Sequence, residues 1–218
     1  MYAIESQYKG IVPMMMDRFY EASDVESGGK RKAKKLNPAE LRRHLELKLH
    51  MDINGIYVPS DNLRMMLIGN QLRRGAATIL GSEIEKGKGT MYRSLCTGCI
   101  WVMGIDNPLK CYIEPSRKTY DSYDERAIPT VKGKGVSRVI TRRPLIELPW
   151  SVRFIIQVTD DGIDQSFVRQ LFDLAGLRCG ICAYGPTFGR CLIDLWQIKS
   201  VGNETESQST KQKGQKQK

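Results

Sequence analysis

Residues 150–198 read WSVRFIIQVTDDGIDQSFVRQLFDLAGLRCGICAYGPTFGRCLIDLWQI, and this stretch decides the predicted fold. Its first part, WSVRFIIQVTDD, alternates apolar and polar residues and is rich in β-branched and aromatic side chains, which predicts a strand. Residues 163–175 repeat apolar side chains at helical spacing, and Gly176 is expected to end that helix. A glycine-rich loop follows, and residues 190–198 alternate again, which predicts the final strand.

The preceding part of the chain supplies the other half of the pattern. Asn37 stands directly before Pro38, and because Asn caps helices and Pro is favoured in their first turn, a helix is predicted to begin there. The remaining predicted elements are a strand within residues 3–16, a strand at 56–59, a helix capped by Ser60 or Asp61 and ended by Gly75, and strands at 94–105 and 111–115.

Joined in order, these elements read strand, helix, strand, strand, helix, strand. That order predicts an α+β fold with a ferredoxin-like or RRM-like β-α-β-β-α-β core. The length of 218 residues and the hydrophobic fraction of 41% suit one such domain. We expect it to span residues 1–200, with insertions at about 17–37, 73–93 and 115–144, and to be followed by a disordered basic tail at 201–218.

The net charge of +10 is unevenly distributed along the chain. Much of it lies in a short run that contains Lys30, Arg31, Lys32, Lys34 and Lys35, and more lies in the tail after Lys199. Basic segments of this kind engage nucleic acid by neutralising phosphates and releasing counterions. The alternative is that they only keep the protein soluble.

Several classes of protein are disfavoured by the pattern. No run approaches the roughly 18 apolar residues of a membrane helix, and the first residues lack the features of a secretory signal. We therefore expect a cytoplasmic protein that does not bind membranes, and cysteines that are reduced thiols or metal ligands. Histidine is confined to one predicted helix and its end, so no catalytic dyad or triad can be argued, and neither an enzyme nor a cofactor is expected.

Two cysteine pairs raise the question of a metal site. Cys96 and Cys99, with Cys179 and Cys182, match the ligand count of a four-cysteine zinc site. The pairs are about eighty residues apart, however, whereas zinc ribbons hold them within about twenty. Inert core or loop thiols are therefore favoured over zinc, which stays an alternative.

The loop before the final strand carries Gly180, Gly185 and Gly189 around Pro186. Glycine allows positive φ and a close approach of the backbone to a phosphate or to a neighbouring chain. The alternative is that the loop only turns the chain back into the sheet.

Residues 116–143 form a long segment with little apolar content that carries several basic residues, with Tyr120 and Tyr123 among them. We expect an arm or hairpin whose cations contact phosphates and whose tyrosines stack on unpaired bases, at about 1–3 kcal/mol per base. The alternative is that Arg142 and Arg143 pair with carboxylates such as Glu147. The predicted nucleic-acid-binding residues are those of the basic run, Lys30, Arg31, Lys32, Lys34 and Lys35, those of the arm, Tyr120, Tyr123, Lys132, Lys134, Arg138, Arg142 and Arg143, and those of the loop, Gly180, Tyr184, Gly185, Gly189 and Arg190.

Four stretches carry a resemblance to a known family. GICAYGPTFGR at 180–190, YKGIVPMMMDRF at 8–19, GIYVPSDNLRMML at 55–67 and VITRRPLIELPWSVRF at 139–154 resemble the RAMP superfamily, which forms the guide-RNA-binding backbone of CRISPR effector complexes. The likeness is closest to small RAMP-like proteins of phages and mobile elements. Those relatives more often carry Asp and Arg where this sequence has Cys182 and Tyr184, which puts a side-chain role at those positions in doubt.

The resemblance implies binding rather than catalysis. Such proteins hold single-stranded RNA or DNA along a basic groove, stack side by side as homo-oligomers or within a CRISPR-type complex, and act in the host cytoplasm when phage-encoded. One alternative is a protein-binding mimic or inhibitor of a CRISPR backbone subunit. Another is a metal-dependent ribonuclease or a zinc-stabilised module, with acidic residues of polar loops, such as Asp121 and Asp160, as metal ligands.

Overall fold

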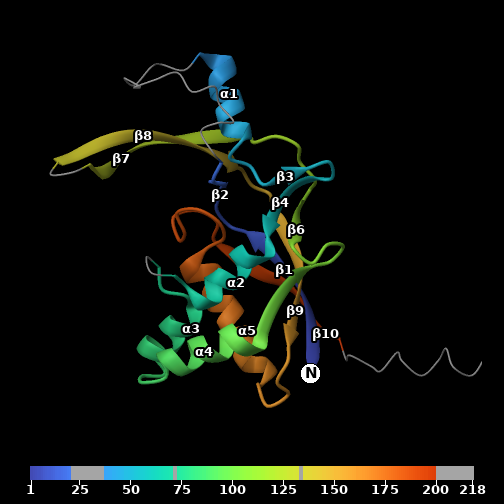
Figure 1. Ribbon diagram of the computed structural model, residues 1–218. Helices are drawn as coiled ribbons and strands as arrows, with labels where there is room; N and C mark the ends of the chain where they lie inside the picture. The colour runs from blue at the N-terminus through green and yellow to red at the C-terminus, as the bar shows by residue number, and fades with distance from the viewer. Residues whose placement is uncertain (21–36, 71–72, 133–134, 200–218) are drawn as a thin grey trace, which may run out of the picture.

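The computed structural model describes residues 1–20, 37–70, 73–132 and 135–199, with side chains given outside 129–139 (Figure 1). The fold is mixed α+β, with antiparallel sheets, as the sequence predicted at that coarse level. The basic run at 30–35 and the tail at 201–218 lie outside the described residues. In the described part, no helix is both long and apolar enough to span a membrane.

The main sheet contains seven strands, and every pair in it is antiparallel. Its order is β10-β1-β9-β6-β4-β3, and β5 pairs with β9 beside β6. The strands are β1 (Tyr2–Gly10), β3 (Met51–Asp52), β4 (Gly55–Pro59), β5 (Ile100–Gly104), β6 (Lys110–Glu114), β9 (Ser151–Val158) and β10 (Cys191–Lys199).

Helical segments cover one face of this sheet (Figure 1). They are α2 (Ser60–Ile68), α3 (Ala76–Ile79), η2 (Leu80–Ile84), α4 (Gly89–Cys99), α5 (Gln165–Leu174) and η3 (Ala175–Cys179). The core lies between the two layers, where Tyr8, Phe154 and Phe172 are fully buried and their rings pack together. The buried Tyr8 hydroxyl donates a hydrogen bond of 2.6 Å to the Phe172 carbonyl oxygen, so the polar end of this ring is satisfied.

A second sheet stands apart from the first. It has the order β2-β8-β7, with β2 at Met14–Met15, β7 at Ser122–Lys132 and β8 at Gly135–Ile146. The hairpin of β7 and β8 projects from the body and passes close to helix α1 (Pro38–Glu46) (Figure 1). The predicted arm at 116–143 is thus mostly a hairpin.

Helix α1 begins where the sequence predicted. The Asn37 side chain accepts a hydrogen bond of 2.8 Å from the Glu40 N–H, and the Glu40 carboxylate accepts one of 3.0 Å from the Asn37 N–H. This reciprocal arrangement satisfies two donors that the helix itself leaves unpaired. Leu45 of α1 and Leu49, three residues after its end, are both buried.

The structure corrects the expectation for residues 73–93. The predicted insertion contains α3, η2 and the start of α4, and residues 94–99 continue α4 as helix rather than belonging to a strand. The reason is that Tyr92 and Cys96 are buried four residues apart, on one face of a helix. Only residues 100–104 of the predicted strand at 94–105 form β5.

Two predicted helix ends are also wrong. Helix α2 ends at Gly69, which has a φ of 74°, and not at Gly75. Its N-cap is Pro59 rather than Ser60 or Asp61, so no side chain caps its first turn by a hydrogen bond. The helix after β9 does not end at Gly176 but continues as η3 to Gly180, whose φ is 73°. Gly176 serves packing instead, because a Cβ there would lie 2.5 Å from the Cys191 carbonyl oxygen.

Candidate nucleic-acid interface

The loop between η3 and β10, residues 180–190, is attached to the segment around β2 by backbone hydrogen bonds. The Ala183 N–H donates to the Met15 carbonyl at 3.0 Å, and the Gly189 N–H donates to the Pro13 carbonyl at 2.8 Å. These bonds hold the loop against the base of the hairpin, because β2 pairs with β8. The loop therefore does more than return the chain to the sheet.

The glycines of this loop meet the chain's own backbone. A Cβ on Gly180 would lie 2.7 Å from the Phe188 carbonyl oxygen, and one on Gly189 would lie 2.9 Å from the Ile181 nitrogen. A Cβ on Gly185 would collide with the Cys179 carbonyl oxygen. Close packing within the loop thus accounts for all three glycines.

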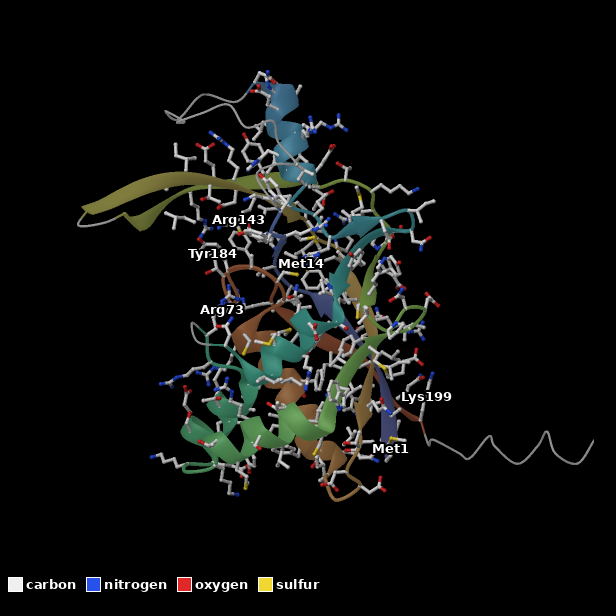
Figure 2. All side chains as sticks on the ribbon, viewed as in Figure 1. Met1, Met14, Arg73, Arg143, Tyr184 and Lys199 are labelled. Atoms are coloured by element: carbon white, nitrogen blue, oxygen red, sulfur yellow. The ribbon has the colours of Figure 1, made fainter. Side chains whose placement is uncertain are left out.

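Tyr184 adopts a backbone conformation that is uncommon for its type. Its φ is 55°, and that of Cys182 is 62°, whereas L-residues with bulky side chains rarely occupy this left-handed region. A side chain held in such a conformation is a candidate for function. Figure 2 labels Tyr184 beside Arg143, below the hairpin.

Strand alternation places two arginines of the hairpin on the face toward this loop. Arg143 lies opposite Asp124 in the register, and Arg126 lies two residues further along β7. The guanidinium carbon of Arg126 is 5.1 Å from the centre of the Tyr184 ring and 5.0 Å from that of Phe188, and the guanidinium carbon of Arg143 is 4.8 Å from the Tyr184 ring centre. Two cations and two aromatic rings therefore converge between the hairpin and the loop, within cation–π range.

Arg142 and Tyr123 lie on the opposite face of the hairpin. Arg142 pairs with Glu125 at 2.5 Å, its direct cross-strand neighbour, and the Tyr123 side chain is exposed. Arg142 and Arg143 both pair with carboxylates, as the alternative expected, but with Glu125 and Asp17. The example that was named, Glu147, instead accepts a hydrogen bond of 2.5 Å from the Ser122 hydroxyl. Arg142 and Arg143, predicted together as binding residues, thus lie on opposite faces of the hairpin.

The remaining predicted residues do not all gather at this surface. Tyr120 packs against the hydrophobic core, so its ring is not a free stacking surface. Arg190 is part-buried at the end of the loop, and its Nε is a buried donor without a partner in the described residues. Five predicted residues belong to the basic run outside the described residues, Lys30, Arg31, Lys32, Lys34 and Lys35. Lys134 is also outside them, and the side chains of Lys132 and Arg138 fall in the part of the hairpin that is not described.

Two charged residues beside Arg143 were not predicted from the sequence, and neither were Arg126 and Phe188. The Asp17 carboxylate accepts a hydrogen bond of 2.5 Å from Arg143 Nε and one of 3.0 Å from Lys48 Nζ. The Arg143 and Lys48 side chains are only 9% and 8% exposed. A buried lysine is rare unless it is paired, but no local sequence pattern shows that Lys48 is buried.

Arg126 forms an ion pair with Asp124, two residues before it on β7. Asp124 accepts hydrogen bonds from Arg126 Nε and Nη2 at 2.5 and 3.1 Å, and this bonding raises the pKa of Arg126 above its usual value. The guanidinium stays charged at any physiological pH and keeps further N–H donors. From the other side of the loop, Arg73 Nη1 donates a hydrogen bond of 3.3 Å to the Cys182 carbonyl.

The cysteines of the two predicted pairs lie in three different elements. Cys96 and Cys99 lie in the last turn of α4, Cys179 ends η3, and Cys182 lies in the loop. Burial raises the pKa of the Cys96 and Cys182 thiols to about 12 and that of Cys179 to about 11. Among the described residues, no three His, Cys, Asp or Glu side chains form a group that could hold a metal ion.

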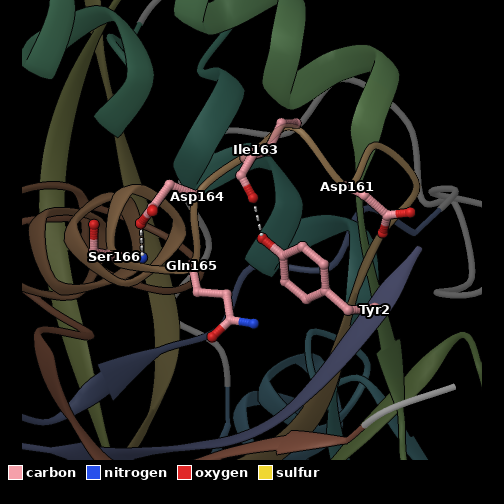
Figure 3. A pocket seen from close by; sticks show the side chains of 6 residues that line it. All are labelled: Tyr2, Asp161, Ile163, Asp164, Gln165 and Ser166. Atoms are coloured by element: carbon pink, nitrogen blue, oxygen red, sulfur yellow. Dashed lines mark hydrogen bonds between the residues drawn. The ribbon is translucent and has the colours of Figure 1, made fainter.

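A separate cavity of about 620 Å³ lies beside the N-terminal end of α5 (Figure 3). Its polar groups are largely engaged, since the Tyr2 hydroxyl donates a 2.8 Å hydrogen bond to the Ile163 carbonyl and Asp164 caps α5 through the Ser166 N–H. Hydrogen bonding from the Ser166 side chain, and then from the Ser166 N–H, lowers the pKa of Asp164. Two acidic side chains, Asp161 and Asp164, line the cavity, so it does not favour a polyanion.

Comparison with known proteins gives no further guide to the site, because no protein-family model matches the chain and no curated protein is similar to it.

Proposed function

We propose that this protein binds single-stranded nucleic acid, without catalysing a reaction, at the surface between the hairpin and the loop at 180–190. The observation that carries the proposal is the convergence of Arg126 and Arg143 on Tyr184, with Phe188 beside them. Guanidinium groups contact phosphates, and aromatic rings or guanidinium planes stack on unpaired bases. Such contacts read little base sequence, so we expect weak sequence preference.

We also infer that the core is ferredoxin-like and RAMP-like. The support is the antiparallel strand order β10-β1-β9-β5, with helices between β1 and β5 and again between β9 and β10. That is the order expected of a β-α-β-β-α-β unit with its two helices on one face.

Side-by-side assembly along the strand is part of the same proposal. The support is that the hairpin projects from the body and exposes Tyr123 and Ile140 on its far face, where a neighbouring copy could cover them (Figure 1).

The two hairpin faces provide a matched test. Arg126→Ala and Arg142→Ala each remove one arginine that is paired with one carboxylate of the hairpin, but only Arg126 faces Tyr184. Binding of fluorescent oligothymidylate and oligouridylate is measured by anisotropy over a range of salt concentrations. We expect Arg126→Ala to weaken binding severalfold and to lower the salt slope by about 0.7, the value for one lost phosphate contact.

Arg142→Ala should bind nearly as the unsubstituted protein does. Equal losses in the two variants would indicate a diffuse charge effect and would refute this location of the site. No binding by the unsubstituted protein at low salt would refute the function itself, and capture of a protein after nuclease treatment would then favour a protein-binding role.

A further inference from the structure

Three charged side chains from distant segments meet beside the loop. Asp17 follows β2, Lys48 follows α1, and Arg143 lies in β8. One carboxylate serves both cations, since Asp17 Oδ2 accepts from Arg143 at 2.5 Å and Oδ1 accepts from Lys48 at 3.0 Å. The two cations are more than nine-tenths buried, whereas the Asp17 side chain is 30% exposed. The cluster therefore meets solvent at its single carboxylate.

The neighbouring charges do not balance the cluster. Asp124 lies opposite Arg143 in the register, but both of its oxygens accept hydrogen bonds from Arg126. Among the described residues, Lys48, Arg143 and Arg126 thus face two carboxylates, which leaves an excess of one positive charge. In addition, Arg143 Nη1 is buried and has no hydrogen-bond partner among the described residues. A buried N–H group that belongs to a cation and has no acceptor is costly, and a bound anion would supply that acceptor.

We propose that Lys48, Asp17 and Arg143 form a phosphate subsite, in which the Asp17 carboxylate stands where an oxyanion binds. This inference rests on the proposed function, and it specifies that the surface binds a phosphate of the strand at this cluster. Arginine offers a planar fork of donors that fits a phosphate, and the lysine adds a compact charge. Because Asp17 is the exposed member, an incoming oxyanion meets the cluster there and competes with Asp17 for the two cations.

The site can be tested with inorganic phosphate as the probe. A ligand that binds only the folded state raises the melting temperature, so the temperature is followed against phosphate at constant ionic strength, with chloride as reference. Lys48→Met keeps the Asp17–Arg143 pair and replaces the buried ammonium by an apolar chain of similar length. It is expected to fold and to lose most of the phosphate-specific rise.

Asp17→Asn is expected to do the opposite. It leaves two buried cations without their carboxylate, so the melting temperature falls without phosphate and rises more with phosphate than in the unsubstituted protein. Glu125→Gln is the control, since it removes the same charge and releases Arg142 on the far face of the hairpin. Its phosphate response should match that of the unsubstituted protein.

The outcomes separate the subsite from the function. If Lys48→Met and Asp17→Asn both respond to phosphate as Glu125→Gln does, the subsite is overturned even where oligothymidylate still binds. If the phosphate response follows the expected order but oligothymidylate does not bind the unsubstituted protein, the subsite stands and the proposed function is overturned. With both intact, Asp17→Asn should also bind oligothymidylate severalfold more tightly.

Discussion

Gly10, the last residue of β1, lies directly against the indole of Trp150, and this contact gives a sharp test of the packing. A Cβ on Gly10 would lie 2.5 Å from Trp150 Cδ2 and Nε1, and closer still to Cε2. The indole is 1% exposed, and its N–H donates a 2.9 Å hydrogen bond to the Val12 carbonyl. Gly10→Ala therefore forces the ring to move in a site that is closed on all sides.

The expected cost follows from two effects. Overpacking of a closed core costs about 1–3 kcal/mol, and loss of the indole hydrogen bond adds about 0.5–1.5 kcal/mol. We expect the free energy of unfolding to fall by about 2–4 kcal/mol, and the melting temperature to fall by about 4–16 °C for a chain of this size. Urea unfolding followed by circular dichroism measures the change, and the m-value should stay constant.

Gly98→Ala is the matched control. Gly98 is exposed within α4, and a Cβ there would meet no atom within 4 Å. Because alanine is favoured over glycine in a helix, this variant should raise the free energy of unfolding by about 0.5–1 kcal/mol. If the two glycine variants shift stability in the same direction, the packing argument for Gly10 is refuted.

Two further predictions concern ionisation. Hydrogen bonds from Lys110, then from Tyr112 and the Asn54 N–H, lower the pKa of Asp52 from 3.8 to about 2. The folded-state pKa lies below the unfolded one, so this stabilisation is present above about pH 4 and is lost as the pH falls toward 2. Urea unfolding between pH 5 and 2 should show a steeper loss of stability for the unsubstituted protein than for Asp52→Asn, and parallel curves would contradict the assignment. Burial raises the pKa of Cys96, Cys111 and Cys182 to about 12, so brief thiol labelling at pH 8, mapped by mass spectrometry, should modify them far more slowly in the folded protein than in urea. Equal rates in the two states would refute this.

The elements with a strict local period were predictable from the sequence. Strands β9 and β10 and helix α5 follow from alternation and helical spacing, and α1 follows from Asn37 and Pro38. The segment at 73–93 misled because its glycines suggest loops. A Cβ on Gly81 would lie 2.6 Å from the Gly89 Cα, so Gly81 instead lets η2 and α4 approach closely.

The candidate site was only half predictable. Arg143 and Tyr184 were predicted from the sequence, but Arg126 and Phe188 were not. Lys48 and Asp17 join Arg143 through tertiary contacts that no local pattern records. Alternation along a strand does distinguish the two adjacent arginines. Adjacent residues of a strand point to opposite faces, so interpreting the arm as a hairpin already implies that Arg142 and Arg143 cannot both face the loop.

Charge pairing also limits how much of the +10 can act at this surface. Within the described interface, Lys48, Arg126 and Arg143 face the carboxylates of Asp17 and Asp124, an excess of one. Each phosphate neutralised on a single strand contributes about 0.7 to the salt slope, so the one excess charge accounts for a slope of about 0.7, and all three cations together account for about 2. A measured slope of about 4 or more would therefore require further cations of the chain, such as those of the basic run at 30–35, to contact the strand as well. In that case the convergent arginines would fix where the strand lies, while cations outside this surface would supply most of its salt-dependent attraction.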